Sequence, residues 1–442
     1  MARRPKPARL VHLDRLEPKG LGGEDEAGRR YELRAGAVGS SVLIRPGRGG
    51  KAEVLELAEP APDQVPAPCP LYGVCGGCQL QTMPLARQRA EKALLVERLA
   101  GHPVAGVEGS SEGYGYRNKL ELSFRSRRFL AEPVEEAEGC HLGFHPPGWH
   151  SRVVEVRSCP LGTPAMNRVL ERVHALAPSP AWDARAGRAG WRHLVMRQGD
   201  EGVLVTLFTS SDIDPAEVQR VAAGLRELPE LSGLLWRVND SVADVAEGAL
   251  REVLHGQAEL SITVNGLPMR LPPDAFFQVN TEGAGQLFDR IGAMLGQGPG
   301  TLLDLYCGVG AIGLVLASAG QRVIGVELLE SAVAVARENA ARLGLPGEWH
   351  AGPVEEILPG LDLSGPLRVV VDPPRAGLHP KAAAFLADLQ AEVLIYVACN
   401  PASLGRDRVA LEAGGWILEE LHVVDLFPQT RHVEAVARFI RR

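Results

Sequence analysis

The chain has 442 residues, which is too long for one ordinary domain and predicts roughly two to four. Hydrophobic residues make up 45% of it and charged residues 23%, as in an ordinary globular protein, and no apolar run reaches the length of a membrane span. The net charge of -7 weighs against a protein that simply coats nucleic acid, although basic patches at 117–119 and 125–128 leave local RNA recognition open. Because no signal-peptide core follows the basic N-terminus, we expect a cytoplasmic protein with no membrane partner.

Short strand-like runs separated by glycine clusters fill residues 1–60, and they predict a small β-barrel of about five strands. The runs are Ala8–Leu13, Arg30–Leu33, Val42–Ile44 and Ala52–Leu57. Five prolines between residues 59 and 70 indicate a linker.

The middle of the chain, residues 61–265, predicts an α+β domain. Met83 to Leu99 carries leucines and charges at helical spacing and is expected to form a helix that packs on the domain after residue 265. Mixed strands and turns follow over residues 116–265.

From about residue 266 to residue 442 strand-like and helical runs alternate, which predicts a parallel sheet with helices on both faces, a Rossmann-like α/β domain. The chain ends in two strand-like runs that we expect to form a hairpin at the end of the sheet. The expected strands are Thr301–Leu305, Arg322–Val326, Leu367–Val371, Val393–Ala398, Trp416–Asp425 and Val433–Ile440.

A glycine-rich loop follows the first of these strands and opens a helix. Its sequence from Gly308 through Gly310 to Gly313 matches G-x-G-x-x-G, and Glu327 ends the next strand. The glycines permit close approach of a ligand to the backbone, and the carboxylate can accept hydrogen bonds from ribose hydroxyls. The pattern fits NAD-dependent and S-adenosylmethionine-dependent enzymes alike. The late position of the loop and the closing hairpin favour the methyl donor, and Cys307 within the loop is expected to be a small packed residue.

A cysteine and two carboxylates stand at strand ends further along. Cys399 directly follows one predicted strand and Asp372 another, and ligands bind at that edge of an open α/β sheet. Both should face the crevice of the glycine loop, although Cys399 could be a buried inert thiol and Asp372 an ordinary turn residue. Glu434 begins the last strand, where it offers either a base or an edge-strand solubility device.

Seven cysteines, an odd number in a long chain, argue against a disulfide framework. Four of them have ligand-like spacing, and the glycines at 73, 76 and 77 would let the backbone wrap closely around a cofactor. An iron–sulfur cluster, zinc and no metal all remain open from this spacing. For His141, His145 and His150, hydrogen-bonded or solvated loop histidines are favoured over a second metal site. The four cysteines are Cys69, Cys75, Cys78 and Cys159.

The C-terminal motifs together resemble the RNA uracil-5-methyltransferase family. These are D-P-P-R-A-G at 372–377, Y-x-x-C-N-P at 396–401 and D-x-F-P-Q-T-x-H-V-E at 425–434, with F-F-Q-V-N at 276–280. The resemblance implies that Cys399 adds to carbon 6 of a flipped-out uracil in RNA, carbon 5 takes the methyl group of S-adenosylmethionine, and Glu434 removes the carbon-5 proton. It also implies that a set of residues lines the cofactor site: Gln278, Tyr306, Gly308, Gly310, Glu327 and Asp372.

The resemblance extends to the first half of the chain. It implies an N-terminal TRAM module, an OB-like RNA-binding barrel, and a 4Fe–4S cluster on the four cysteines, with a structural or RNA-organising role. The barrel and cluster look most like the branch that acts on large-subunit ribosomal RNA, with a tRNA T-loop uridine as the alternative, and the enzyme is expected to be a monomer. From other classes, an iron–sulfur NAD-dependent oxidoreductase and a non-catalytic RNA-binding protein remain alternatives.

Two positions depart from the family pattern. Ala398 stands where serine is common, which removes a hydroxyl but no catalytic group. Pro353 stands where relatives usually carry Asp or Asn, so a side-chain contact to adenine is not expected there.

Overall fold

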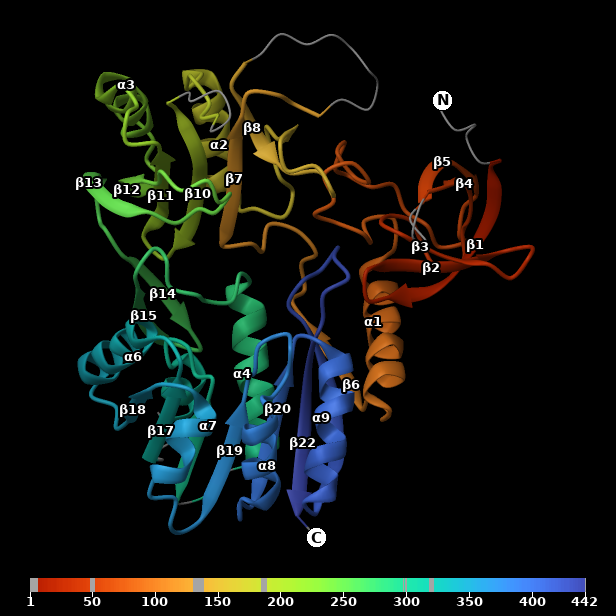
Figure 1. Cartoon of the computed structure of the whole chain (residues 1–442), viewed down its shortest axis with the longest axis vertical. Helices are drawn as coiled ribbons and strands as arrows, with labels where there is room; N and C mark the ends of the chain where they lie inside the picture. The colour runs from red at the N-terminus through yellow and green to blue at the C-terminus, as the bar shows by residue number, and fades with distance from the viewer. Residues whose placement is uncertain are drawn as a thin grey trace.

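The computed structural model describes residues 7–47, 52–129, 139–183, 189–296, 298, 300–317 and 322–441. Within them the strands form one sheet of five, one of seven and one of eight strands, with a separate two-stranded hairpin. In Figure 1 the eight-stranded sheet and its helices occupy the lower half, and the other two sheets lie above its upper edge.

The N-terminal sheet contains the expected five strands, all antiparallel, in the order β3-β2-β1-β4-β5. Its two edge strands, β3 and β5, contact each other. One glycine cluster expected to separate strands is itself strand β2, which pairs with both β1 and β3. Glycine is needed at its start, since a Cβ at Gly20 would lie 2.0 Å from the Leu33 carbonyl oxygen. The strands are β1 (Arg9–Glu17), β2 (Gly20–Asp25), β3 (Arg30–Leu33), β4 (Ser41–Pro46) and β5 (Ala52–Glu59).

The central sheet is mixed, in the order β13-β12-β11-β10-β7-β8-β9, and its apolar face packs on helices α2 and α3. Strands β11 and β12 are parallel because α3 connects them, and the other pairs in this sheet are antiparallel. The elements are β7 (Lys119–Arg125), β8 (His141–Phe144), β9 (Val154–Glu155), α2 (Pro164–Leu176), β10 (Trp191–Gly199), β11 (Gly202–Thr209), α3 (Pro215–Leu225), β12 (Leu231–Val238) and β13 (Ala249–Gly256).

The C-terminal sheet has the order β18-β17-β16-β19-β20-β22-β21-β6, and β16 to β20 run parallel to one another. The predicted closing hairpin is present as the antiparallel pair β21 and β22. The elements are α4 (Thr281–Leu295), β16 (Thr301–Leu305), α5 (Ala311–Ala317), β17 (Arg322–Glu327), α6 (Glu330–Leu343), β18 (Glu348–Ala351), α7 (Val354–Ile357), the short 3₁₀ helix η1 (Leu358–Gly360), β19 (Leu367–Val371), α8 (Pro380–Asp388), β20 (Val393–Ala398), α9 (Pro401–Ala413), β21 (Trp416–Asp425) and β22 (Glu434–Arg441).

Two early elements join this C-terminal sheet. Helix α1 (Leu85–Ala100) packs on α9, where a Cβ at Gly405 would lie 2.3 Å from the Leu99 carbonyl oxygen. Strand β6 (Gly106–Gly109) pairs in parallel with β21 at the sheet edge. Residues that precede the central sheet in the sequence therefore belong spatially to the C-terminal one.

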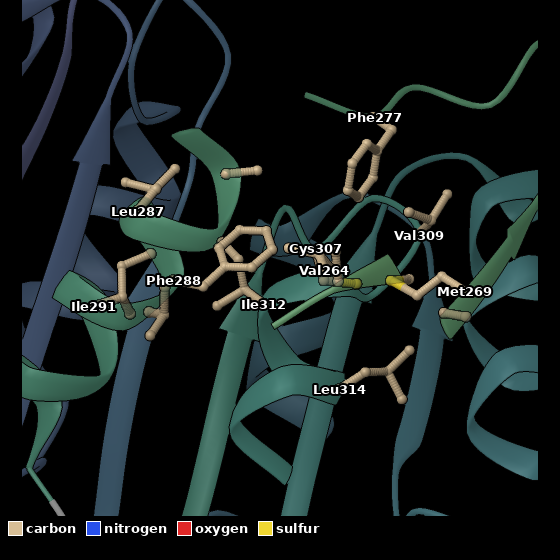
Figure 2. Packing of buried hydrophobic residues seen from close by; sticks show 14 of the residues in the cluster. Val264, Met269, Phe277, Leu287, Phe288, Ile291, Cys307, Val309, Ile312 and Leu314 are labelled. Carbon is tan, nitrogen blue, oxygen red and sulfur yellow. The ribbon is translucent and has the colours of Figure 1, made fainter. Parts of the chain in front are cut away.

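The hairpin of β14 (Leu260–Val264) and β15 (Leu267–Leu271) connects the central and C-terminal parts. The predicted boundary between residues 265 and 266 falls in the turn of this hairpin. The hairpin packs with α4 against the glycine-rich loop, and Figure 2 shows Val264, Met269 and Phe277 beside Cys307 and Val309. Cys307 is thus a buried packing residue, as expected.

Candidate active site

Three predicted residues meet at one edge of the C-terminal sheet. Cys399 directly follows β20, and Asp372 directly follows the parallel neighbour β19. Strand β22 runs antiparallel to β20, with Ala398 opposite Ala435, so Glu434 begins β22 beside Cys399. This edge is the upper end of the C-terminal sheet in Figure 1.

Two buried carboxyl groups and a thiol lie close together at this site, and each has a raised pKa. Burial, and then the Asp372 carboxyl, raise the pKa of Glu434 well above its usual value. Burial raises the pKa of Asp372 to about 7. The pKa of the Cys399 thiol rises to about 11, chiefly through burial and then through Glu434 and Asp372. Without a substrate, the Cys399 thiol is therefore protonated at neutral pH.

The Arg375 guanidinium opposes these shifts, since it lowers the pKa of both Cys399 and Glu434. Asn400 fixes the loop that carries it, because its Nδ2 donates to the Arg375 carbonyl oxygen at 2.9 Å. The Asn400 Oδ1 also accepts from Ala402 N at 3.3 Å as the N-cap of α9. Sequence reasoning assigned neither residue a role, although each adjoins a predicted site residue in its motif.

The glycine-rich loop contacts Glu327, which ends β17 as predicted. Gly308 N donates to Glu327 Oε2 at 3.1 Å, and the space around the Gly308 Cα is open to a ligand. Gly310 has a φ of 76°, and an added Cβ would lie 2.7 Å from the Trp349 ring. Both features require glycine.

A buried aspartate that the sequence did not single out holds this loop. Asp304 Oδ2 accepts from Gly313 N at 2.9 Å, and the side chain is fully buried. Burial raises the pKa of Asp304 to about 7, and Asp372 and Glu327 add to the shift. The sequence signal for it is an acidic residue at the second-last position of β16, the strand before the glycine-rich loop.

The remaining predicted cofactor residues border the same loop. Tyr306 follows β16 with a φ of 62°, and burial raises its pKa to about 12. Gln278 follows Phe277, which packs near Val309 (Figure 2). The Gln278 carbonyl oxygen accepts a hydrogen bond from Asn118 Nδ2 at 2.9 Å.

The turn after β18 also adjoins Glu327, since Gly352 N donates to the Glu327 carbonyl oxygen at 2.9 Å. Next comes Pro353, which is the N-cap of α7. Neither residue has a polar side-chain atom to offer a ligand.

The four predicted metal-ligand cysteines come together although Cys159 lies 81 positions after Cys78. Burial raises the pKa of Cys78 to about 12, and Cys159, Cys75 and Cys69 add to the rise. All four are half-buried, and Cys159 N donates to Asn167 Oδ1 at 2.8 Å. In the described ranges, however, no three His, Cys, Asp or Glu side chains are arranged to hold a metal ion.

The three loop histidines have other partners. His141 Nδ1 lies 3.2 Å from Glu155 Oε2, and His145 Nε2 lies 3.0 Å from Asp244 Oδ2. The His145 and His150 rings are 6.2 Å apart. His145 is a hydrogen-bonded loop histidine, as predicted, whereas His141 is hydrogen-bonded at the start of strand β8.

Comparison with known proteins identifies the family. A family model described as tRNA (uracil-5-)-methyltransferase matches residues 252–345 and 361–442. An RNA methyltransferase of Caldanaerobacter subterraneus is 33% identical over 96% of this chain and 97% of that protein, and one of Clostridium tetani is 30% identical over 98% and 97%. The chain belongs to the RNA uracil-5-methyltransferase family.

A solved structure agrees with this membership. The Pyrococcus abyssi tRNA (uracil-54, C5)-methyltransferase, in complex with S-adenosyl-L-homocysteine, has a TM-score of 0.77 and 25% identity over 97% of this chain and 100% of that one. The methyltransferase is thus an S-adenosylmethionine-dependent enzyme with an α/β methyltransferase fold, which decides between the two cofactors that the glycine loop fitted. None of the helices in the described part of the chain has the length and hydropathy that crossing a membrane requires.

Proposed function

We propose that Cys399 and Glu434 methylate carbon 5 of an RNA uridine through a covalent intermediate. The thiolate of Cys399 adds to carbon 6, which moves electron density to carbon 5 as an enolate. Carbon 5 takes the methyl group and releases S-adenosylhomocysteine. Glu434 then removes the carbon-5 proton, and elimination expels the thiolate and restores the ring double bond. The observation that carries this proposal is the placement of Cys399 beside Glu434 on paired strands.

The raised pKa values suit these roles. Because the strength of a base follows the pKa of its conjugate acid, a buried Glu434 carboxylate removes the carbon-5 proton more effectively than an exposed one. Cys399 needs its proton removed before it attacks, since the thiolate is the nucleophile. Arg375 supports that ionisation.

We further propose that S-adenosylmethionine binds along the ends of β16, β17 and β19. The open backbone at Gly308 and the acidic side chain of Glu327 support this location. At Gly352 and Pro353 the adenine would meet backbone and an apolar ring. The proposed cofactor residues are Gln278, Tyr306, Gly308, Gly310, Glu327 and Asp372.

We propose a 4Fe–4S cluster as the group held by Cys69, Cys75, Cys78 and Cys159. A cluster of four irons spaces its thiolates more widely than a single ion does, and four mutually interacting, half-buried thiols fit such a group. When bound it supplies a structural crosslink, and no step of methyl transfer passes through it. Iron and sulfide analysis tests this: Cys78→Ser should lose the visible absorption, whereas a colourless protein with stoichiometric zinc would refute the cluster.

The RNA partner and the roles of the domains belong to the same proposal. We propose that residues 1–60 form an OB-like RNA-binding module, 61–265 a central domain with the cluster, and 266–442 the catalytic domain of a cytoplasmic monomer. Within 61–265, helix α1 and strand β6 pack on the catalytic domain. Large-subunit ribosomal RNA is the leading substrate. A tRNA T-loop uridine is the second candidate, which the likeness to the Pyrococcus abyssi tRNA enzyme favours. Incubating separated ribosomal RNA and tRNA with radioactive methyl donor distinguishes them.

The nucleophile has a direct test. RNA that carries 5-fluorouridine should trap a covalent adduct on Cys399, because fluorine cannot leave as a proton does. Cys399→Ala should abolish the adduct and leave S-adenosylmethionine binding intact. An unchanged adduct yield in that variant would refute the assignment.

A further inference from the structure

The loop that leads into Glu434 is held by a helix far away in the sequence. This loop, residues 426–433, joins β21 to β22, and Asp425 ends the first of these strands. Lys92 on α1 places its Nζ 2.5 Å from Asp425 Oδ1 and 2.9 Å from the Phe427 carbonyl oxygen. The side chains of Lys92 and Asp425 are both 0% exposed. Water therefore does not compete for this contact.

A second residue of α1, Gln88, is hydrogen-bonded to the middle of the loop. The backbone N–H of Gln429 donates to Gln88 Oε1 at 2.8 Å, which fixes the orientation of the Gln88 amide. Gln88 Nε2 in turn donates to Gln429 Oε1 at 2.9 Å. Gln429 has a φ of 68°, a conformation that side chains other than glycine adopt rarely and that needs support from its surroundings.

Gln79 and Leu80, which follow Cys78, also hydrogen-bond to the loop. Gln79 N and Leu80 N both donate to the Gln429 carbonyl oxygen at 3.0 Å. Gln79 Oε1 accepts from Arg431 N at 3.2 Å. Gln79 follows Cys78 directly in the sequence. The loop is thus fixed at its start, middle and end by residues 79–92.

We propose that Gln79, Gln88 and Lys92 are positioning residues that set the place of Glu434 through this loop. Val424 and Glu434 pair across β21 and β22. The loop therefore connects Asp425, which is held by Lys92, to the proposed base Glu434. These residues belong to neither the cofactor loop nor the nucleophile strand, so they act on proton removal and not on cofactor binding. The inference rests on the proposed role of Glu434.

The test compares Gln88→Ala with Leu94→Ala, a matched substitution at an exposed position of the same helix. Proton removal follows methyl transfer, so a displaced Glu434 should let a methylated covalent adduct accumulate on RNA with ordinary uridine. The kcat of Gln88→Ala should fall about tenfold to a hundredfold, with the KM for S-adenosylmethionine unchanged. Hydrogen exchange in residues 426–433 should rise in this variant. Leu94→Ala should behave as the wild type in all three measurements.

A conservative variant guards against simple misfolding. Gln88→Met fills nearly the same volume as the buried Gln88 but makes none of its hydrogen bonds to Gln429, so it should keep the fold and show the same loss of kcat as Gln88→Ala. Normal turnover in Gln88→Ala, or a loss of turnover with no adduct on ordinary uridine, would overturn the inference. If the wild type forms no adduct even with 5-fluorouridine, the covalent mechanism itself fails.

Discussion

Replacing Lys92 with methionine should lower the free energy of unfolding by about 3–5 kcal/mol. The wild-type ammonium and the Asp425 carboxylate are 2.5 Å apart, and both side chains are fully buried. Methionine nearly fills the same volume but leaves the buried carboxylate with only the more distant Arg89 guanidinium, whose Nε lies 3.7 Å from Asp425 Oδ2. The lost hydrogen bond to the Phe427 carbonyl oxygen belongs to the same network, so its contribution does not simply add.

Urea denaturation followed by fluorescence and by circular dichroism measures this change, provided that both transitions coincide and the cysteine site is in the same state in every sample. The double variant Lys92→Met/Asp425→Leu replaces the whole pair by apolar groups and should recover most of the loss. As a control, Arg322→Met breaks the exposed pair with Glu348 and should cost less than about 1 kcal/mol. A loss in Lys92→Met as small as in this control would refute the reasoning.

Three further predictions concern the catalytic domain. Gly310→Ala should abolish S-adenosylmethionine binding in a calorimetric titration and destabilise the fold by roughly 2–5 kcal/mol, because of its positive φ and the nearby Trp349 ring. Folding raises the pKa of Asp304 from 3.8 to about 7. The contribution of its protonated form to the free energy of unfolding is therefore fully present below pH 3.8 and is lost as the pH rises through 7. Asp304→Asn should therefore flatten thermal stability against pH over that window, by at most about 1.4 kcal/mol per pH unit, and an unchanged slope would contradict this. Glu434→Gln should slow turnover by about 10²–10⁴ while a covalent adduct with ordinary uridine RNA builds up on denaturing gels, and an adduct that fails to appear would argue against its role as the base.

Much of the candidate site could be read from the sequence because each residue stands at a strand end. Parallel strands bring their carboxyl ends to one edge, so Cys399 and Asp372 had to face the same crevice once β19 and β20 were recognised. The glycine spacing likewise predicted a ligand-binding loop with Glu327 at the end of the next strand, and in the structure Gly308 N donates to Glu327 Oε2. These relations follow from local patterns and from one general rule of sheet geometry.

The electrostatics of the site could not be read in this way. The pKa values of Cys399, Asp372 and Glu434 rise chiefly because the fold buries them, and burial depends on what covers the sheet edge. Arg375 opposes the shifts for a similar reason, since its effect depends on distance in space and not on its place in a motif.

The sequence by itself predicted the residues of the proposed chemistry, because a cysteine, two carboxylates and a glycine loop are recognisable from residue type and position along alternating strands. Tertiary structure alone decided what surrounds and supports them. Lys92 and Asp425 lie 333 positions apart, and no periodicity links them. The pairing of β6 with the C-terminal sheet and the strand conformation of the glycine cluster in β2 also depend on contacts between distant parts of the chain. Each depends on which surfaces pack together, and that is fixed only when the whole chain has folded.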